Sequence, residues 1–409
     1  MSASGGPELQ TGVADLHCHF PMHLRETAEE PTNPPFEGMV RQRPGWVNKL
    51  RAWLLARAAE RLNYASESAT WRVSLERIRA GDVRVVLSVL YQPFAEMDFG
   101  RWPEGGPESG YFQSLTDELA AVERELERLD PGHTEHKVVR SGADLEQALG
   151  DGRTAFVHCI EGGFHLGATE AEVRDNVDRL ADAGVAYVTL AHLFFRQIAK
   201  NAPALPFLSD RAYKLLFWQW GRRALTDLGR AAVEAMYRRR ILIDVSHMRE
   251  DAVAEVFALI EELDRATGAS PTDYPVIATH AGFRLGKQSY NLSAETVRRI
   301  AARGGVVGVI FAEHQLLDGY DGPPPTTIDD SVAVLGRHIT AIAEVGGYEC
   351  VALGSDLDGF IKPTLPGLQN IDDLAQLPER LERDHPGHAP AIVSGNAIRV
   401  LETMFAGRA

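Results

Sequence analysis

Residues 12–19 read GVADLHCH, a short apolar run that ends in a pair of histidines. In a strand, residues i and i+2 point to the same side, so His17 and His19 would face one cation together. A polar loop after a strand would also account for such a pair, which occurs by chance in many proteins. The choice between a loop and a metal site depends on whether other strands end in the same way.

Seven further apolar, β-branched runs recur along the chain, and amphipathic helical patterns separate them. The runs cover residues 83–91, 154–162, 186–193, 241–247, 275–280, 305–311 and 350–356. Near-continuous apolar strands that alternate with helices indicate a parallel sheet whose outer face is covered. Eight such units predict an α/β fold of the (β/α)8 (TIM) barrel type, with a doubly wound open sheet as the alternative.

The chain is predicted to form a single domain over residues 1–409, with a helical insertion at about 24–82. Within that insertion, apolar side chains recur at helical spacing at Trp46, Leu50, Trp53, Leu54, Ala58 and Leu62. The connection 92–153 is also long. Connections of this length are usually lids or interface elements, and a decoration that only extends the core is an equal alternative.

Composition and charge exclude several classes of protein. The chain has 44% hydrophobic and 24% charged residues, which is typical of a globular protein, and a formal net charge of −15. This charge argues against a nucleic-acid partner and against an anionic membrane. We expect no secretory signal at the N-terminus, and no segment reaches the length of a membrane span. Three scattered cysteines give no disulfide framework, so we expect a cytoplasmic protein.

Side chains of the kinds that bind metals stand at or near the ends of six of the eight predicted strands. They are His17, His19, Glu161, His192, His247, His280 and Asp356. In a barrel these ends converge on one rim, where active sites lie. Histidine, glutamate and aspartate are ligands of zinc and similar ions. A single histidine in such a place is usually structural, but this joint occurrence indicates a metal site.

The number of ligands is sufficient for two ions. His17 and His19 would hold one, His247 and His280 the other, and Glu161 would bridge them. Two neighbouring ions activate water and polarise a carbonyl oxygen. Asp356 binds neither ion in this allocation and is the natural proton shuttle. A mononuclear site is the alternative.

With these residues in place, the sequence resembles the membrane dipeptidase (renal dipeptidase) family of amidohydrolase-type metal hydrolases. The similar blocks include ADLHCHFP (14–21), IEGG (160–163), IDVSH (243–247) and GSDLDG (354–359). The resemblance implies a barrel with two zinc ions that cleaves dipeptides, often as a homodimer. It also implies that His17, His19 and Glu161 bind one zinc, that Glu161, His247 and His280 bind the other, that His192 contacts the substrate and the developing oxyanion, and that Asp356 is the catalytic acid and base.

The chain departs from the family pattern at two positions. His19 stands where the family has the aspartate of H-x-D, which keeps a zinc ligand but removes a negative charge. Tyr290, in SYNL (289–292), stands where the family has the arginine of P-R-N-L that clamps the substrate carboxylate. Tyrosine cannot form a bidentate charged pair, so we expect a neutral or apolar substrate group at Tyr290. Arg284 matches an arginine that the family already has, and it is a further candidate for substrate binding.

These observations favour a metal-dependent hydrolase of amide bonds in small molecules, with dipeptides as the first expectation. One alternative is hydrolysis of another carbonyl substrate, such as an N-acyl amino acid or a lactone. A different alternative is a non-catalytic barrel that binds a metal or ligand. Asp356 argues against the non-catalytic alternative, because a binding protein needs no proton shuttle.

Overall fold

The computed structural model describes residues 12–23, 46, 50, 71–92, 96, 108–205, 208–359, 361 and 363–408. Its strands pair in parallel in the order β1-β2-β4-β5-β6-β7-β8-β9, and β3 lies off this path beside β4. The bounds are β1 (Val13–Cys18), β2 (Val83–Leu90), β3 (His136–Val138), β4 (Thr154–Glu161), β5 (Tyr187–Thr189), β6 (Leu242–Asp244), β7 (Val276–Ala281), β8 (Val307–Val309) and β9 (Val351–Leu353). All eight predicted strands are present, whereas β3 is not predicted.

The first strand meets the residues that follow the last one. Cys18 forms a parallel bridge with Leu357, and the backbone N–H of His19 donates to the carbonyl oxygen of Leu357 at 2.9 Å. The N–H of Asp356 donates to the carbonyl oxygen of His17 at 2.8 Å. These contacts bring the two ends of the sheet together, so the fold is a (β/α)8 barrel rather than an open sheet.

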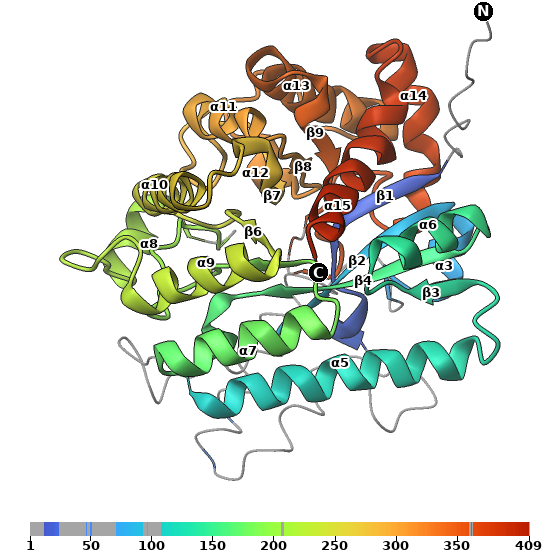
Figure 1. Ribbon diagram of the computed structural model, residues 1–409. Helices are drawn as coiled ribbons and strands as arrows, with labels where there is room; N and C mark the ends of the chain where they lie inside the picture. The colour runs from blue at the N-terminus through green and yellow to red at the C-terminus, as the bar shows by residue number, and fades with distance from the viewer. Residues whose placement is uncertain are drawn as a thin grey trace, which may run out of the picture.

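Helices surround the strands, as Figure 1 shows. Their bounds are α3 (Leu75–Ala80), α5 (Ser109–Leu129), α6 (Gly142–Gly150), α7 (Glu170–Asp182), α8 (Asp210–Leu216), α9 (Asp227–Arg239), α10 (Glu250–Thr267), α11 (Ala294–Ala302), α12 (Glu313–Leu316), α13 (Ile328–Gly346), α14 (Leu377–Asp384) and α15 (Asn396–Ala406). Side-chain caps fix where several begin: Thr226 accepts from the N–H of Gly229, and Ser293 accepts from the N–H of Thr296. The longer helices bury an apolar stripe in the barrel core, as α9 does with Ala232, Val233 and Met236.

Two glycines allow neighbouring strands to approach closely. A Cβ on Gly308 in β8 would lie 2.0 Å from the carbonyl oxygen of Thr279 in β7. A Cβ on Gly354, directly after β9, would lie 1.7 Å from the same oxygen. No side chain fits at either position, so both glycines are required for the spacing of β7, β8 and β9.

The predicted helical insertion at about 24–82 lies largely outside the described residues. Of its predicted apolar face only Trp46 and Leu50 are described, and both are exposed. The connection 92–153 contains α5, β3 and α6. Across the part of the chain that the structure describes, every helix is too short or too polar to cross a membrane. Cys18, Cys159 and Cys350 are buried and unpaired, as the sequence predicts.

We expect Gly354→Ala and Gly308→Ala to destabilise the barrel, because an added methyl group must push β7 away. Such overpacking typically costs about 1–3 kcal/mol. Gly110→Ala is the matched control, since no atom lies within 4 Å of a Cβ added there in α5. The test is the midpoint of urea unfolding. An unshifted midpoint for Gly354→Ala would contradict this account of the strand spacing.

Candidate active site

Glu161, the last residue of β4, lies at the centre of a buried cluster on one rim of the barrel. Its two carboxylate oxygens lie 3.3–3.5 Å from the Nε2 atoms of five histidines, which are His17, His19, His192, His247 and His280. The structure therefore brings together six residues that the sequence analysis selected from the ends of separate strands.

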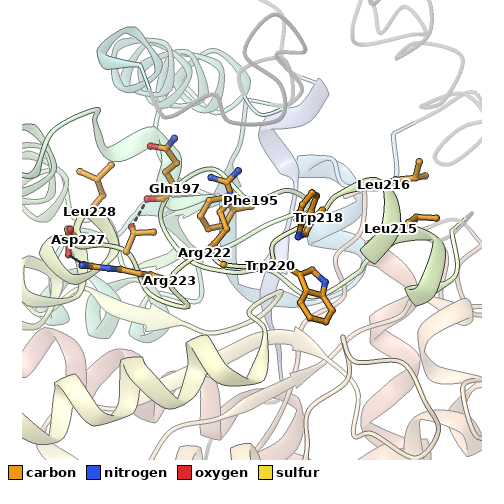
Figure 2. Close-up of a pocket in the computed structure, with 12 residues that line it drawn as sticks. Phe195, Gln197, Leu215, Leu216, Trp218, Trp220, Arg222, Arg223, Asp227 and Leu228 are labelled. Atoms are coloured by element: carbon orange, nitrogen blue, oxygen red, sulfur yellow. Dashed lines mark hydrogen bonds and ion pairs between the residues drawn. The ribbon is translucent and has the colours of Figure 1, made fainter.

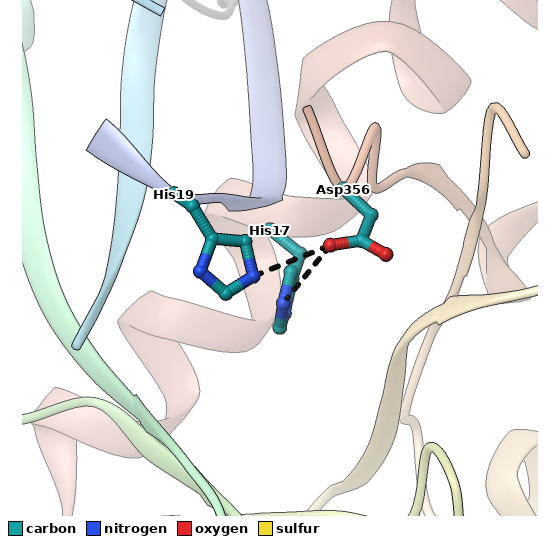
Figure 3. A group of neighbouring side chains, drawn as sticks. All are labelled: His17, His19 and Asp356. Atoms are coloured by element: carbon teal, nitrogen blue, oxygen red, sulfur yellow. Dashed lines mark ion pairs between the residues drawn. The ribbon is translucent and has the colours of Figure 1, made fainter. Parts of the chain in front are cut away.

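Asp356 joins this cluster from the turn after β9. Its Oδ1 atom lies 3.3 Å from the Nε2 atom of His19 and 3.7 Å from that of His17 (Figure 3). Asp356 has a left-handed backbone with φ of 57°, and His247 has one with φ of 63°. Non-glycine residues adopt this conformation at a cost, which the surrounding structure must offset. The backbone N–H of Asp356 donates to the carbonyl oxygen of His17, and this hydrogen bond helps to hold the turn.

The chemistry of the cluster fits a divalent cation. The Nε2 atoms of His17 and His19 and the Oε1 atom of Glu161 are buried without a hydrogen-bond partner among the described residues. The Nε2 atoms of His247 and His280 face each other at 2.8 Å. Burial lowers the pKa of His17, His247 and His280, which favours the neutral imidazole that binds metal.

His19 differs from these three histidines in its electrostatics. Burial lowers its pKa, but the contacts with Asp356 and Glu161 raise it to about 10. A proton on His19 thus supplies positive charge between two carboxylates. A bound cation would supply the same positive charge and leave the imidazole free to coordinate it. Replacing the family's aspartate by histidine is therefore compatible with a metal ligand at this position.

The donors fall into three overlapping groups, each with its ligand atoms within 4.8 Å of one another. They are His17 with His19 and Asp356, His17 with Glu161 and His280, and Glu161 with His192 and His247. The shared membership of His17 and Glu161 makes this one continuous site rather than separate ones.

Asp244, at the end of β6, holds the layer beneath the cluster in place. Its fully buried carboxylate accepts hydrogen bonds from the hydroxyl groups of Thr189 and Thr279, each at 2.6 Å. The Thr279 Oγ1 atom also lies 3.0 Å from Nδ1 of His17 and 2.8 Å from Nδ1 of His280. This network fixes the ring orientation of both histidines, as outer partners of metal ligands do.

Glu96 plays a similar part for His192. It is fully buried and accepts from His192 Nδ1 at 2.7 Å, from the Tyr91 hydroxyl at 2.7 Å and from the N–H of Phe194 at 2.9 Å. Burial lowers the pKa of His192, but Glu161 and Glu96 raise it above its usual value. Nδ1 therefore carries a proton, and Nε2 is turned towards Glu161.

The sequence analysis missed both Asp244 and Glu96. Asp244 had a usable signal, because a carboxylate inside the apolar run ILIDVSH needs buried partners. Glu96 had none, because it lies in the long connection after β2.

Tyr290 and Arg284 are both engaged with their surroundings. The buried Tyr290 hydroxyl donates to the carbonyl oxygen of His280 at 2.7 Å, and its ring centroid lies 4.9 Å from that of His247. Arg284 donates to the carbonyl oxygen of Asn291 at 2.8 Å and pairs with Glu250 at 3.0 Å. A role of either residue in substrate binding stays a prediction.

The chain is similar to several known proteins. The sequence profile of the family described as Membrane dipeptidase (Peptidase family M19) matches residues 9–407. A Klebsiella pneumoniae protein, "Uncharacterized protein in pqqA 5'region", is 31% identical in an alignment of 245 positions that covers 58% of this chain and 76% of that protein. Dipeptidase tcpJ of Claviceps purpurea is 24% identical in an alignment of 414 positions that covers 98% of this chain and 86% of that protein.

A solved structure supports the fold. The crystal structure of a metallo peptidase from Rhodobacter sphaeroides, liganded with a phosphinate mimic of the dipeptide L-Ala-D-Ala, has a TM-score of 0.66 against this chain at 19% identity. The match covers 96% of this chain and 99% of the Rhodobacter chain. At this identity the likeness establishes the barrel and its layout alone.

We expect Thr279→Val to weaken metal binding, because the rings of His17 and His280 lose their shared hydroxyl partner. Loss of such a partner typically lowers metal affinity by roughly 10–100-fold. Thr296→Val, on the outer helix α11, is the control. Competition of each protein with a chromogenic zinc chelator measures the affinity. Equal zinc affinity in Thr279→Val and the unmodified protein would show that this hydroxyl does not orient the rings.

Proposed function

The chain belongs to the membrane dipeptidase family, peptidase family M19, and on this basis we propose that it hydrolyses amide bonds in small molecules, dipeptides first, with two zinc ions. The observation that carries the proposal is the position of Glu161 among five histidine nitrogens at 3.3–3.5 Å, with Asp356 beside two of those histidines. A metal-dependent, dipeptidase-like hydrolase needs these donors together with a proton-transfer group.

In the proposed allocation Glu161 would be shared between the two ions. His17 and His19 would be the further ligands of the first ion, and His247 and His280 those of the second. Zinc bound there would polarise the scissile carbonyl group and lower the pKa of a water molecule. The side chains of the cluster are at most 6% exposed, which limits the access of other water and strengthens the electrostatic interactions inside.

Two side chains are left to act on the substrate. Asp356 lies on the side of His17 and His19, where its carboxylate would take the proton of the attacking water and deliver it to the leaving amine. His192 presents Nε2 to the centre of the cluster while Glu96 holds Nδ1. It would donate to the carbonyl oxygen as negative charge develops there.

The same arrangement would also serve an N-acyl amino acid or a lactone, because both present a carbonyl carbon to the attacking water. The family membership favours dipeptides. A screen of zinc-loaded protein against dipeptides, N-acyl amino acids and lactones separates these substrates. A protein that binds zinc but hydrolyses none of them would instead be a binding barrel.

We expect purified protein to hold about two zinc ions per chain and Glu161→Gln to lose occupancy at both positions, because the bridge loses its charge. His158→Gln is the matched control on the same strand, since His158 pairs with Glu123 away from the cluster. Elemental analysis after dialysis gives the metal content. A single zinc per chain, or full occupancy in Glu161→Gln, would contradict the bridged pair.

We expect Asp356→Asn to retain zinc while turnover falls by roughly 10²–10⁴-fold, the usual effect of losing a general acid or base. Asp321→Asn, an exposed carboxylate paired with Arg337, is the control for loss of one negative charge. The measurement is kcat on a dipeptide found in the screen, with zinc content determined on the same samples. Full activity in Asp356→Asn would remove this residue from the mechanism.

A further inference from the structure

Exposed apolar side chains that follow and include the end of α8 line a hollow of about 760 Å³. It lies over α8 and the start of α9, where the side chains of Leu215, Trp218 and Trp220 are exposed (Figure 2). None of the described residues that line it belongs to the cluster around Glu161. Nothing in the structure shows what covers this hollow, so it supports no binding proposal.

The turn that carries Asp356 ends at Gly359, and this glycine leaves the space that the Asp356 carboxylate occupies. A Cβ at position 359 would lie 1.9 Å from the Oδ1 atom of Asp356 and 2.7 Å from the Cδ2 atom of His19. Packed heavy atoms lie about 3.5–4.0 Å apart, so a side chain at position 359 must displace the carboxylate or the whole turn. The φ of Gly359 lies outside the left-handed region, so this space, and not backbone freedom, requires the glycine.

Asp358 keeps the turn from moving. It is fully buried and has a left-handed backbone with φ of 67°. Its Oδ2 atom accepts from the backbone N–H of Arg72 at 3.2 Å and from that of Val73 at 3.0 Å. The carbonyl oxygen of Arg72 in turn accepts from the N–H of Ile371 at 3.0 Å. These hydrogen bonds offset the cost of the backbone conformation and attach the turn to the segment that leads into α3.

The same turn is also held by β1, through the hydrogen bond from the N–H of Asp356 to His17 and that from the N–H of His19 to Leu357. A turn fixed on both sides transmits any added bulk at position 359 to the part that is free to rotate. That part is the carboxylate of Asp356, whose Oδ1 atom lies 3.3 Å from the Nε2 atom of His19 (Figure 3).

We propose that Asp358 and Gly359 are positioning residues for Asp356. Asp358 anchors the turn, and Gly359 leaves the space from which the Asp356 carboxylate reaches the metal site. This inference rests on the proposed hydrolase function and deepens it, because it names the residues that direct the proton-transfer group. Such a group must lie within hydrogen-bond reach of the proton that it takes, and a misplacement of about 1 Å can lower the rate roughly 100-fold.

The first test is Gly359→Ala, assayed at saturating zinc with a dipeptide found in the screen. We expect kcat to fall by roughly 100-fold while KM stays close to that of the unmodified protein, because the carboxylate moves and the substrate contacts remain. Gly286→Ala is the matched control, since a Cβ there would lie 2.5 Å from both carboxylate oxygens of Asp318, outside the cluster. An unchanged kcat in Gly359→Ala, or an equal loss in Gly286→Ala, would overturn the proposal.

The second test separates the anchoring of the turn from general stability. Asp358→Ala removes the acceptor of two N–H groups, so kcat of the folded protein should fall. Asp358→Asn keeps an acceptor oxygen and tolerates a left-handed backbone, so it should retain most of the activity. Urea midpoints measured on the same samples report stability. A lower midpoint without a change in kcat for Asp358→Ala, or an Asp358→Asn variant no more active than Asp358→Ala, would contradict the anchoring role.

The geometry is tested without a substrate by crystal structures of the zinc-loaded unmodified protein and the Gly359→Ala variant. The Oδ1 atom of Asp356 should leave the place beside His19 that it has in the unmodified protein. If none of the screened compounds is hydrolysed, the proposed function fails, and this displacement still decides whether Gly359 positions the carboxylate. A carboxylate that keeps its place in Gly359→Ala would overturn the proposal.

Discussion

The contact between β1 and the residues after β9 is the constraint on which the site depends. Asp15 is fully buried in β1 and accepts from the N–H of Ser355 at 2.8 Å and from its hydroxyl at 2.5 Å. Together with the backbone hydrogen bonds of His17 and His19, this joins residues about 340 positions apart in sequence. The part of the cluster that joins His17 and His19 to Asp356 depends on this seam, because the two histidines lie on one side of it and Asp356 on the other.

Buried negative charge is a second constraint on the rim. Glu96, Glu161, Asp244 and Asp356 all lie at or just beneath one rim, and each is at most 5% exposed. Carboxylates in such surroundings need compensation, since isolated buried charges are strongly unfavourable. Hydroxyl and backbone donors satisfy Asp244, and His192 satisfies Glu96. The ion-pair partners of Glu161 among the described side chains are five imidazoles. Burial lowers the pKa of three of them, whereas neighbouring carboxylates raise the pKa of His19 and His192. The rim is thus short of positive charge, and a divalent cation would meet that need.

Much of this architecture follows from the sequence, because the strands of a parallel barrel are short, apolar and regularly spaced. The run 241–247 was longer than β6 (Leu242–Asp244), since the last residues turn out of the sheet to present His247. The short strand β3 has two polar residues in three and no alternation to detect. The gathering of His17, His19, Glu161 and Asp356 on one rim follows from their places at the ends of predicted strands, and metal binding by these residues stays a prediction. The partners Glu96 and Asp244 and the direction of the Tyr290 hydroxyl could not be predicted, because they depend on distances across the fold.

The pairing register of β1 also decides to which side of the strand Cys18 points. It lies between His17 and His19, but strand alternation turns it to the other side, where it packs in the buried cluster with Val86 and Leu90. Burial raises the pKa of its thiol well above the usual value, so it stays protonated there. A slip of one residue in the pairing of β1 would exchange the two sides of the strand. It would then present one soft sulfur ligand in place of two imidazoles. The pairing register of the first strand, and not only its composition, therefore decides whether nitrogen or sulfur atoms of β1 face the rim.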